Sequence, residues 1–134
     1  MEVKKRVLFL DDRSDRFKRA IEHYKDYDLT IVCTVQECIE KISEGGWYIV
    51  SLDHDLNYER FVDSNREDCG MEVVRFFCKN ILYLVPPTKI TIHSSNHLVN
   101  VKMANKILDA MDSNSIYKRP LVNVEQLPYL EEQS

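Results

Sequence analysis

Short, unbroken apolar runs alternate along this chain with segments of helical periodicity. The run RVLFL at 6–10 is apolar at successive positions, which is typical of a strand buried on both faces of a parallel sheet. Similar runs follow as LTIVC at 29–33, WYIVSLD at 47–53 and KITIH at 89–93. This alternation predicts an α/β fold with a mostly parallel sheet, right-handed crossovers and helices on both faces.

Capping residues mark where the intervening helices begin. We expect Asp12 or Ser14 to cap the first helix, because both side chains accept hydrogen bonds from orphan backbone amides. The sequence TVQE at 34–37 is a capping box for the second helix. Ser94 or Ser95 is expected to cap the last helix.

The chain length of 134 residues fits one domain, and we expect residues 1–134 to form it. We expect the segment 113–134 to form a fifth strand or two short extended pieces, followed by a frayed tail. The polar segment 57–68 is long for a connection, and is either a lid or an exposed idle loop. Gly70 is expected to permit a tight turn or the close approach of a ligand.

Composition excludes some functions. The net charge of −4 gives no basic field for duplex DNA, so a nucleic-acid substrate would need a local patch or a metal ion. The four cysteines contain no CxxC pair, which favours reduced thiols in the core over zinc or disulfides. The first apolar run is too short for a signal peptide and no run could span a membrane, so we expect a cytoplasmic protein.

Chemically active side chains follow three of the predicted strands. In a parallel α/β sheet the ligand binds outside the carboxyl ends of the strands, so these residues are expected to share one crevice. They are Asp11 and Asp12 after the first strand, Asp53, His54 and Asp55 after the third, and His93, Ser94, Ser95 and Asn96 after the fourth.

Carboxylates that converge on one crevice repel each other unless a cation or a proton joins them. Asp11, Asp12 and Asp53 therefore predict a divalent-cation site, with Mg²⁺ favoured for its oxygen ligands and Mn²⁺ as a second choice. The competing interpretation is that Asp12 and Asp55 cap a helix and a turn, which leaves one or two carboxylates in the crevice.

His54 and His93 follow strands that should be neighbours. Two imidazoles over one crevice suit acid and base catalysis at a phosphate, with Asp53 and Asp55 beside them, or would ligate a transition metal. For either histidine taken alone, a hydrogen bond to a nearby carbonyl is the simpler expectation.

Phosphate binding is expected at the start of the last helix. The sequence HSSN offers the hydroxyls of Ser94 and Ser95 and the amide of Asn96, close to a helix N-terminus that attracts anions. Arg13, Arg16 and Arg66 are candidates to pair the phosphate, with Arg13 best placed directly after Asp12.

The chain resembles receiver domains, which have paired acids after the first strand, an aspartate after the third and a small hydroxyl residue after the fourth. More closely, it resembles the cyclic-phosphate-processing receiver-like family (cREC). The shared motifs are LFLDDR at 8–13, SLDHDL at 51–56, the glycine in DCGMEVVRFF and IHSSN at 92–96 with the later Met103. They extend from the first strand to the last helix.

The resemblance implies a receiver-like, flavodoxin-type three-layer sandwich with a five-stranded sheet. Asp11 and Asp12 match the acidic pair and Asp53 matches the phospho-acceptor position. The additions peculiar to the family match His54, Asp55, His93, Ser94 and Asn96. The chain departs from the family pattern in two places. His97 and Val99 stand where a proline and a glycine are expected. The lysine that receivers have after the fifth strand, before a proline, corresponds at best to Lys118.

These observations favour a metal-assisted phosphoesterase acting on a 2′,3′-cyclic phosphate at an RNA end or in a small nucleotide. A strained five-membered cyclic phosphodiester needs only modest acid and base assistance. The alternatives are a non-enzymatic receiver phosphorylated on Asp53, and a module that binds a nucleotide without turning it over.

Overall fold

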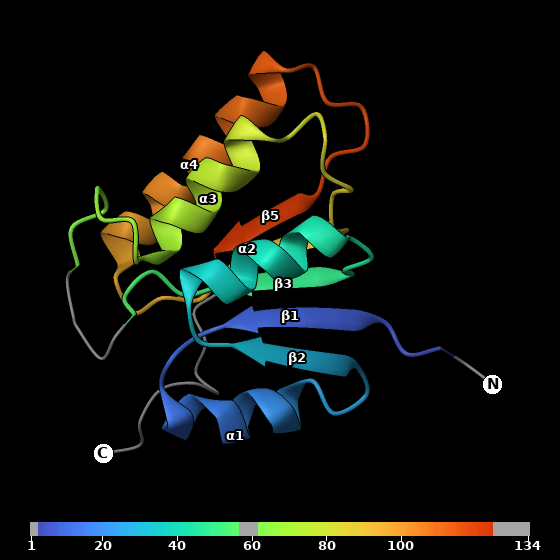
Figure 1. Cartoon of the computed structure of the whole chain (residues 1–134), viewed down its shortest axis with the longest axis vertical. Coiled ribbons are helices and arrows are strands. Elements are labelled where there is room, and N and C mark those ends of the chain that lie inside the picture. Colours follow the sequence, from blue (N-terminus) through green and yellow to red (C-terminus); the bar gives the residue numbers. More distant parts are fainter. Residues whose placement is uncertain (1–2, 57–61, 125–134) are drawn as a thin grey trace.

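Strands and helices alternate throughout the computed structural model, which describes residues 3–56 and 62–124 (Figure 1). In chain order the elements are β1 (Arg6–Leu10), α1 (Ser14–His23), β2 (Asp28–Val32), α2 (Val35–Glu44), β3 (Ile49–Leu52), α3 (Gly70–Lys79), β4 (Lys89–Ile92), α4 (His97–Ser113) and β5 (Leu121–Val124). The strands form one parallel sheet in the order β2-β1-β3-β4-β5. The predicted receiver-like α/β sandwich is therefore confirmed.

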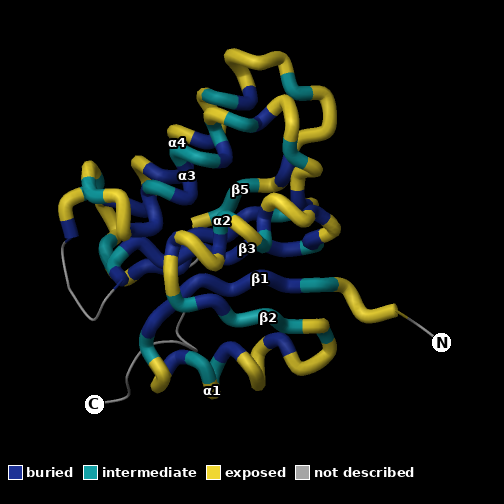
Figure 2. Tube along the Cα trace, viewed as in Figure 1, coloured by how far each residue is buried: buried dark blue, intermediate teal, exposed yellow. Residues whose placement is uncertain are grey.

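The central strands β1, β3 and β4 are buried on both faces, which explains why they are mainly apolar. Leu8 and Leu10 of β1 pack with the core that α2, α3 and α4 cover, whereas Val7 and Phe9 pack on the α1 side with Ala20. Figure 2 shows the central strands buried and the outer faces of the helices exposed.

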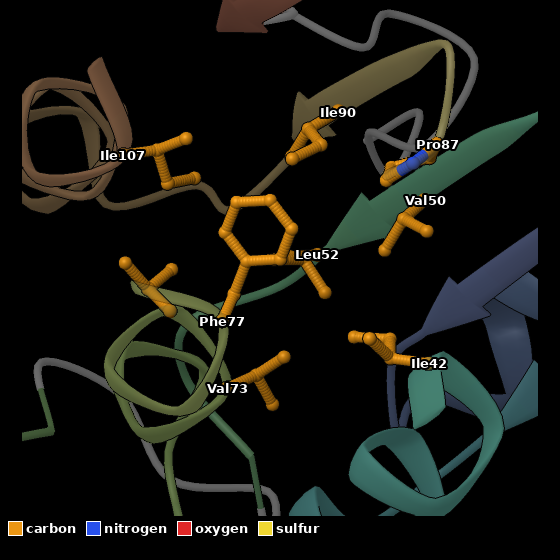
Figure 3. A pocket seen from close by; sticks show the side chains of 9 residues that line it. Ile42, Val50, Leu52, Val73, Phe77, Pro87, Ile90 and Ile107 are labelled. Carbon is orange, nitrogen blue, oxygen red and sulfur yellow. The ribbon is translucent and has the colours of Figure 1, made fainter. Parts of the chain in front are cut away.

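A small apolar pocket lies between the sheet and the three helices on its larger face (Figure 3). Its lining consists of aliphatic, aromatic and proline side chains, so it belongs to the core and offers no group for catalysis. The lining residues are Ile42, Val50, Leu52, Val73, Val74, Phe77, Pro87, Ile90 and Ile107.

Helix capping follows the sequence prediction at α2 and departs from it at α1 and α4. The Thr34 side chain accepts a hydrogen bond from Glu37 N at 3.2 Å, as the capping box predicts. The α1 cap position belongs to Arg13, so neither Asp12 nor Ser14 caps that helix. Asn96, one residue beyond Ser95, caps α4 by accepting a hydrogen bond from Val99 N.

Two predictions about the C-terminal region have different outcomes. The predicted fifth strand is present as β5, which pairs in parallel with β4 at the sheet edge. Lys118 precedes β5, at the amino end of a parallel strand. It therefore lies at the sheet edge opposite to the predicted crevice and cannot replace a receiver's lysine. The predicted frayed tail falls mainly on 125–134, outside the described residues.

The four cysteines are free thiols, and Cys38 and Cys69 are buried. Burial raises the pKa of the Cys38 thiol to about 12, as expected for a small core residue. None of the described helices combines the length and apolar character needed to cross a membrane.

Gly70 permits a close approach, but of the chain's own backbone. A Cβ atom at Gly70 would lie 1.9 Å from Asp53 O and 2.9 Å from His54 Cα, and the Gly70 amide donates to His54 O at 2.9 Å. The start of α3 is thus fixed directly against the residues that follow β3.

We predict that Gly70→Ala lowers the free energy of unfolding by about 3 kcal/mol or more, because backbone atoms cannot yield to the added methyl group. Gly46→Ala is the control: its φ of 82° is strained for alanine, but its new Cβ meets its nearest neighbour at 3.6 Å. It should cost roughly 1–2 kcal/mol. Urea unfolding of both variants tests this, and equal losses would contradict it.

Candidate active site

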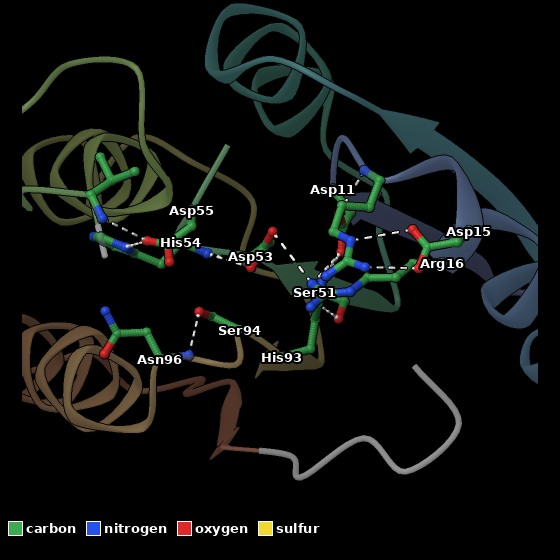
Figure 4. Close-up of polar contacts among 12 residues, drawn as sticks. Asp11, Asp15, Arg16, Ser51, Asp53, His54, Asp55, His93, Ser94 and Asn96 are labelled. Carbon is green, nitrogen blue, oxygen red and sulfur yellow. Dashed lines mark hydrogen bonds and ion pairs between the residues drawn. The ribbon is translucent and has the colours of Figure 1, made fainter. Parts of the chain in front are cut away.

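The parallel ladder continues one residue beyond β1, β3 and β4. Asp11 N donates to Val32 O at 3.1 Å, Asp53 N to Leu10 O at 3.0 Å and His93 N to Leu52 O at 2.9 Å. These bonds fix the first residue after each strand against the neighbouring strand. Asp11, Asp53 and His93 therefore lie side by side at the carboxyl edge of the sheet (Figure 4).

These three residues form a buried cluster with Arg16, which we call the acid cluster. Each of the four is at most 7% exposed. Asp11 Oδ2 lies 3.1 Å from His93 Nε2 and 3.1 Å from Arg16 Nη1. The same Arg16 nitrogen is 3.6 Å from Asp53 Oδ2. One guanidinium, carried by the first turn of α1, thus contacts both carboxylates.

A chain of hydroxyl groups holds His93 from its other side. Thr91 Oγ1 donates to Ser51 Oγ at 2.7 Å, and Ser51 Oγ is 2.7 Å from His93 Nδ1. If Ser51 donates to Nδ1, the imidazole carries its proton on Nε2 and donates to Asp11. Phe9 stacks on the ring with centroids 4.4 Å apart. Both nitrogens and one face of His93 are therefore engaged inside the protein.

The two carboxylates of the acid cluster have opposite pKa shifts. Burial raises the pKa of Asp11, but the hydrogen bond and charge of His93 and the charge of Arg16 outweigh it, so that pKa is lowered. Burial and the adjacent Asp11 charge raise the pKa of Asp53 well above its usual value. Arg16 thus compensates the pair incompletely, and a further positive charge would be favourable.

A second group, the His54 relay, lies beside the acid cluster. His54 Nδ1 is 2.6 Å from Asp55 Oδ1, and His54 Nε2 is 3.1 Å from Ser64 Oγ. Burial lowers the pKa of His54, but contacts with Cys69 and Asp55 outweigh it and raise the pKa. His54 is fully buried, whereas Ser64 is partly exposed, so Ser64 lies between the imidazole and the surface.

Hydrogen bonds hold the described part of the 57–68 segment to the rest of the protein, although several of its residues are exposed. Asp55 accepts a hydrogen bond from Val62 N at 3.2 Å. The Arg75 guanidinium donates to the carbonyl oxygens of Ser64 and Arg66, the latter at 2.7 Å. Residues 62–66 are therefore held against Asp55, after β3, and against Arg75 of α3. Residues 57–61 of the predicted lid lie outside the described residues.

The residues predicted to bind phosphate separate into two groups. Ser94 is buried and accepts a hydrogen bond from Asn96 N at 3.0 Å, while Ser95 is exposed. They stand with Asn96 at the N-terminus of α4, as expected. Arg13 contacts the acid cluster through its backbone amide, which donates to Asp11 Oδ1. Its guanidinium pairs with Asp15 at 2.9 Å.

The predicted metal ligands are only partly brought together. Among the described residues, one group of three offers ligand atoms within 4.8 Å of one another, and it consists of Asp11, Asp53 and His93. Asp12 is buried but does not belong to this group. The third member of the group is His93, which the sequence predicts to be a catalytic residue.

The sequence predicts no role for Ser51, Thr91 or Ser64, and it favours Arg13 over Arg16 as the arginine of the site. Ser51 and Thr91 carried a signal, since each is a polar residue inside a buried strand. Arg16 also carried one: a cation in the first turn of a helix faces the positive end of the helix dipole and needs a specific anionic partner. Ser64 lies in a long polar segment, where one serine cannot be distinguished from its neighbours.

Comparisons with known proteins agree with the fold and with the motifs. A family model described as the cyclic-phosphate processing receiver domain matches residues 6–109. The structure resembles a CheY-like receiver domain from Methanospirillum hungatei JF-1, with 17% identity, a TM-score of 0.58 and coverage of 94% of this chain and 85% of that one. It also resembles the response regulator domain of Thermotoga maritima CheB, with 15% identity, a TM-score of 0.58 and coverage of 95% and 80%. No curated protein matches the chain.

The pKa shifts of the acid cluster predict opposite effects of two isosteric substitutions. The folded-state pKa of Asp53 is raised, so its ionisation destabilises the fold once the pH passes the unfolded value of about 3.9. Asp53→Asn should therefore raise the free energy of unfolding at pH 7 in EDTA. The gain should vanish as the pH falls below about 4.

Asp11→Asn should have the opposite effect. The pKa of Asp11 is lowered, so its charge stabilises the fold above the unfolded pKa, and this contribution is lost as the pH falls through the folded pKa. The substitution also leaves Arg16 with a weaker partner, and should cost about 3 kcal/mol at pH 7. Urea unfolding from pH 3 to pH 7 tests both variants, and shifts of the same sign would contradict the assignment.

Proposed function

This chain belongs to the cyclic-phosphate processing receiver family, and from that premise we propose that it is a metal-assisted phosphoesterase. Its substrate would be a 2′,3′-cyclic phosphate at an RNA end or in a small nucleotide. The observation that carries the proposal is that the acid cluster and the His54 relay follow one another at the end of β3, where His54 N donates to Asp53 Oδ1 at 2.9 Å. A phospho-acceptor site alone gives no reason for the second of these groups.

The acid cluster fits a divalent cation. Asp11 and Asp53 would supply carboxylate oxygens, which suit Mg²⁺ or Mn²⁺, and a His93 ring nitrogen lies within 4.8 Å of them. The geometry supports this, since two buried carboxylates share one guanidinium, and the raised pKa of Asp53 reflects the same burial and the adjacent Asp11 charge. A bound cation would polarise the phosphoryl oxygens and stabilise the charge that develops on them.

The His54 relay would move the proton that hydrolysis requires. Opening the ring forms one P–O bond to water and breaks one to a ribose oxygen, so one proton passes from the water to that oxygen. Asp55 orients the imidazole through Nδ1, which leaves Nε2 as the reactive atom. Since Nε2 faces Ser64 Oγ, the proton would pass through this hydroxyl or through an oxygen that replaces it.

His93 has a different role in this proposal. Because Asp11 and Ser51 engage both of its nitrogens, His93 would hold Asp11 in position rather than meet the substrate directly. The first turn of α4, with Asn96 and the Ser94 and Ser95 hydroxyls, would bind the phosphate through N–H and O–H donors.

A non-enzymatic receiver phosphorylated on Asp53 is the second candidate. The receiver fold and the position of Asp53 directly after β3 favour it. The His54 relay counts against it, because phosphorylation of Asp53 needs no second histidine paired with a carboxylate. Incubation with acetyl phosphate and Mg²⁺ would distinguish it by an adduct of one phosphate that Asp53→Asn abolishes.

We predict that the protein converts 2′,3′-cyclic mononucleotides, or a short RNA with that terminus, to products heavier by one water. The reaction should require Mg²⁺ or Mn²⁺ and stop in EDTA. His54→Ala should lower kcat by about 100-fold or more, the usual contribution of a general acid or base. Mass spectrometry of the products and initial rates measure both effects.

His23→Ala is the matched control, because His23 is an exposed histidine at the end of α1 and should leave the rate unchanged. The histidines of the site should separate in Mn²⁺ titrations: His93→Ala weakens metal binding, whereas His54→Ala leaves it unchanged. Turnover that survives His54→Ala at full rate would rule out the relay. Binding of the cyclic nucleotide without turnover would identify a capture module instead.

A further inference from the structure

The proposed reaction gives no role to Arg16, although this residue lies at the centre of the acid cluster. Its Nη1 atom is 3.1 Å from Asp11 Oδ2 and 3.6 Å from Asp53 Oδ2. The side chain is 8% exposed, so the guanidinium is inside the protein rather than on its rim. Arg16 therefore contacts both carboxylates that a divalent cation would need.

The hydrogen bonding of Arg16 is incomplete. Its Nε atom is buried and has no hydrogen-bond partner among the described residues. A buried N–H group that makes no hydrogen bond carries a free-energy cost. Arg16 also lies in the first turn of α1, where the helix dipole opposes a positive charge. The attraction of two buried carboxylates thus holds the side chain in an otherwise unfavourable position.

A divalent cation and the guanidinium cannot occupy this position together. A metal of this class binds carboxylate oxygens at about 2.0–2.6 Å, whereas Nη1 already lies at contact distance from one oxygen of each carboxylate. Two positive charges so close in a buried site would also repel each other strongly. His93 Nε2, at 3.1 Å from the same Asp11 oxygen, restricts the remaining space further.

We propose that Arg16 and a divalent cation bind the Asp11–Asp53 carboxylate pair in mutual exclusion. In the metal-free protein Arg16 acts as a built-in counterion that stabilises the fold. Metal entry displaces the guanidinium, and the work of displacing it sets the metal affinity of the site. This inference rests on the metal-dependent part of the proposed function, and its test reads metal binding rather than turnover.

The test is an isothermal titration of Mn²⁺ and of Mg²⁺ into the wild type and Arg16→Met. Removing the competing cation should lower the dissociation constant for Mn²⁺ by about tenfold or more, the scale of one charged hydrogen bond. Lys18→Met is the matched control, since Lys18 is exposed on the same helix and its loss changes the net charge equally. Its affinity should stay within about twofold of the wild type, because exposed charges are screened.

Equal Mn²⁺ affinities in the wild type and Arg16→Met would overturn the inference and leave the metal site standing. Stronger binding in Lys18→Met to the same degree as in Arg16→Met would also overturn it, since net charge would then explain the gain. If neither the wild type nor Arg16→Met binds Mn²⁺, the metal-dependent part of the proposed function falls together with the inference.

Two further measurements cover the case in which Arg16→Met does not fold without metal. Arg16→Lys keeps the charge, and its Mn²⁺ affinity should remain closer to that of the wild type than to that of Arg16→Met. In the wild type, the Nε–H signal of Arg16 in a nitrogen-15 NMR spectrum should move and exchange faster with water at saturating Mg²⁺. An unchanged signal at saturation would overturn the inference without any variant.

Discussion

Two carboxylates buried side by side are the constraint on which the arrangement of this site depends. The parallel ladder extends one residue past β1 and β3 and leaves Asp11 and Asp53 adjacent at the sheet edge. Burial disfavours charge on both, and each charge disfavours the other. Arg16 and His93 both bind Asp11, so one guanidinium and one imidazole stabilise the buried carboxylate pair. The position of every other polar group in the cluster follows from this arrangement.

The two histidines have similar positions in the sequence, because His93 is the first residue after β4 and His54 is the second residue after β3. Their surroundings in the structure differ. His93 is enclosed by Ser51, Asp11 and the ring of Phe9. His54 is also buried, but its Nε2 atom faces a partly exposed hydroxyl group, that of Ser64. This difference is the basis for the two proposed roles, His93 holding a carboxylate and His54 exchanging a proton with a ligand.

The chain has the fold of receiver domains, but a fold does not determine which functional site it carries. The comparison structures share this fold at low identity, so they show the fold and not the chemistry of the site. In this chain the strand ends carry a guanidinium that contacts both carboxylates, and a histidine relay whose Ser64 carbonyl accepts a hydrogen bond from Arg75. Both distinguish the site from one that needs only a phospho-acceptor aspartate and a metal.

The sequence by itself determined the order of strands and helices and the residues that end β1, β3 and β4, because apolar runs and capping patterns act over a few neighbouring residues. It predicted that Asp11, Asp53 and His93 would share a crevice, since parallel strands end at one edge. Only the tertiary structure decided that Arg16 rather than Arg13 contacts both carboxylates and that Ser64 lies against His54. Those outcomes depend on side-chain direction and on contacts between residues distant in the chain, which no local pattern records.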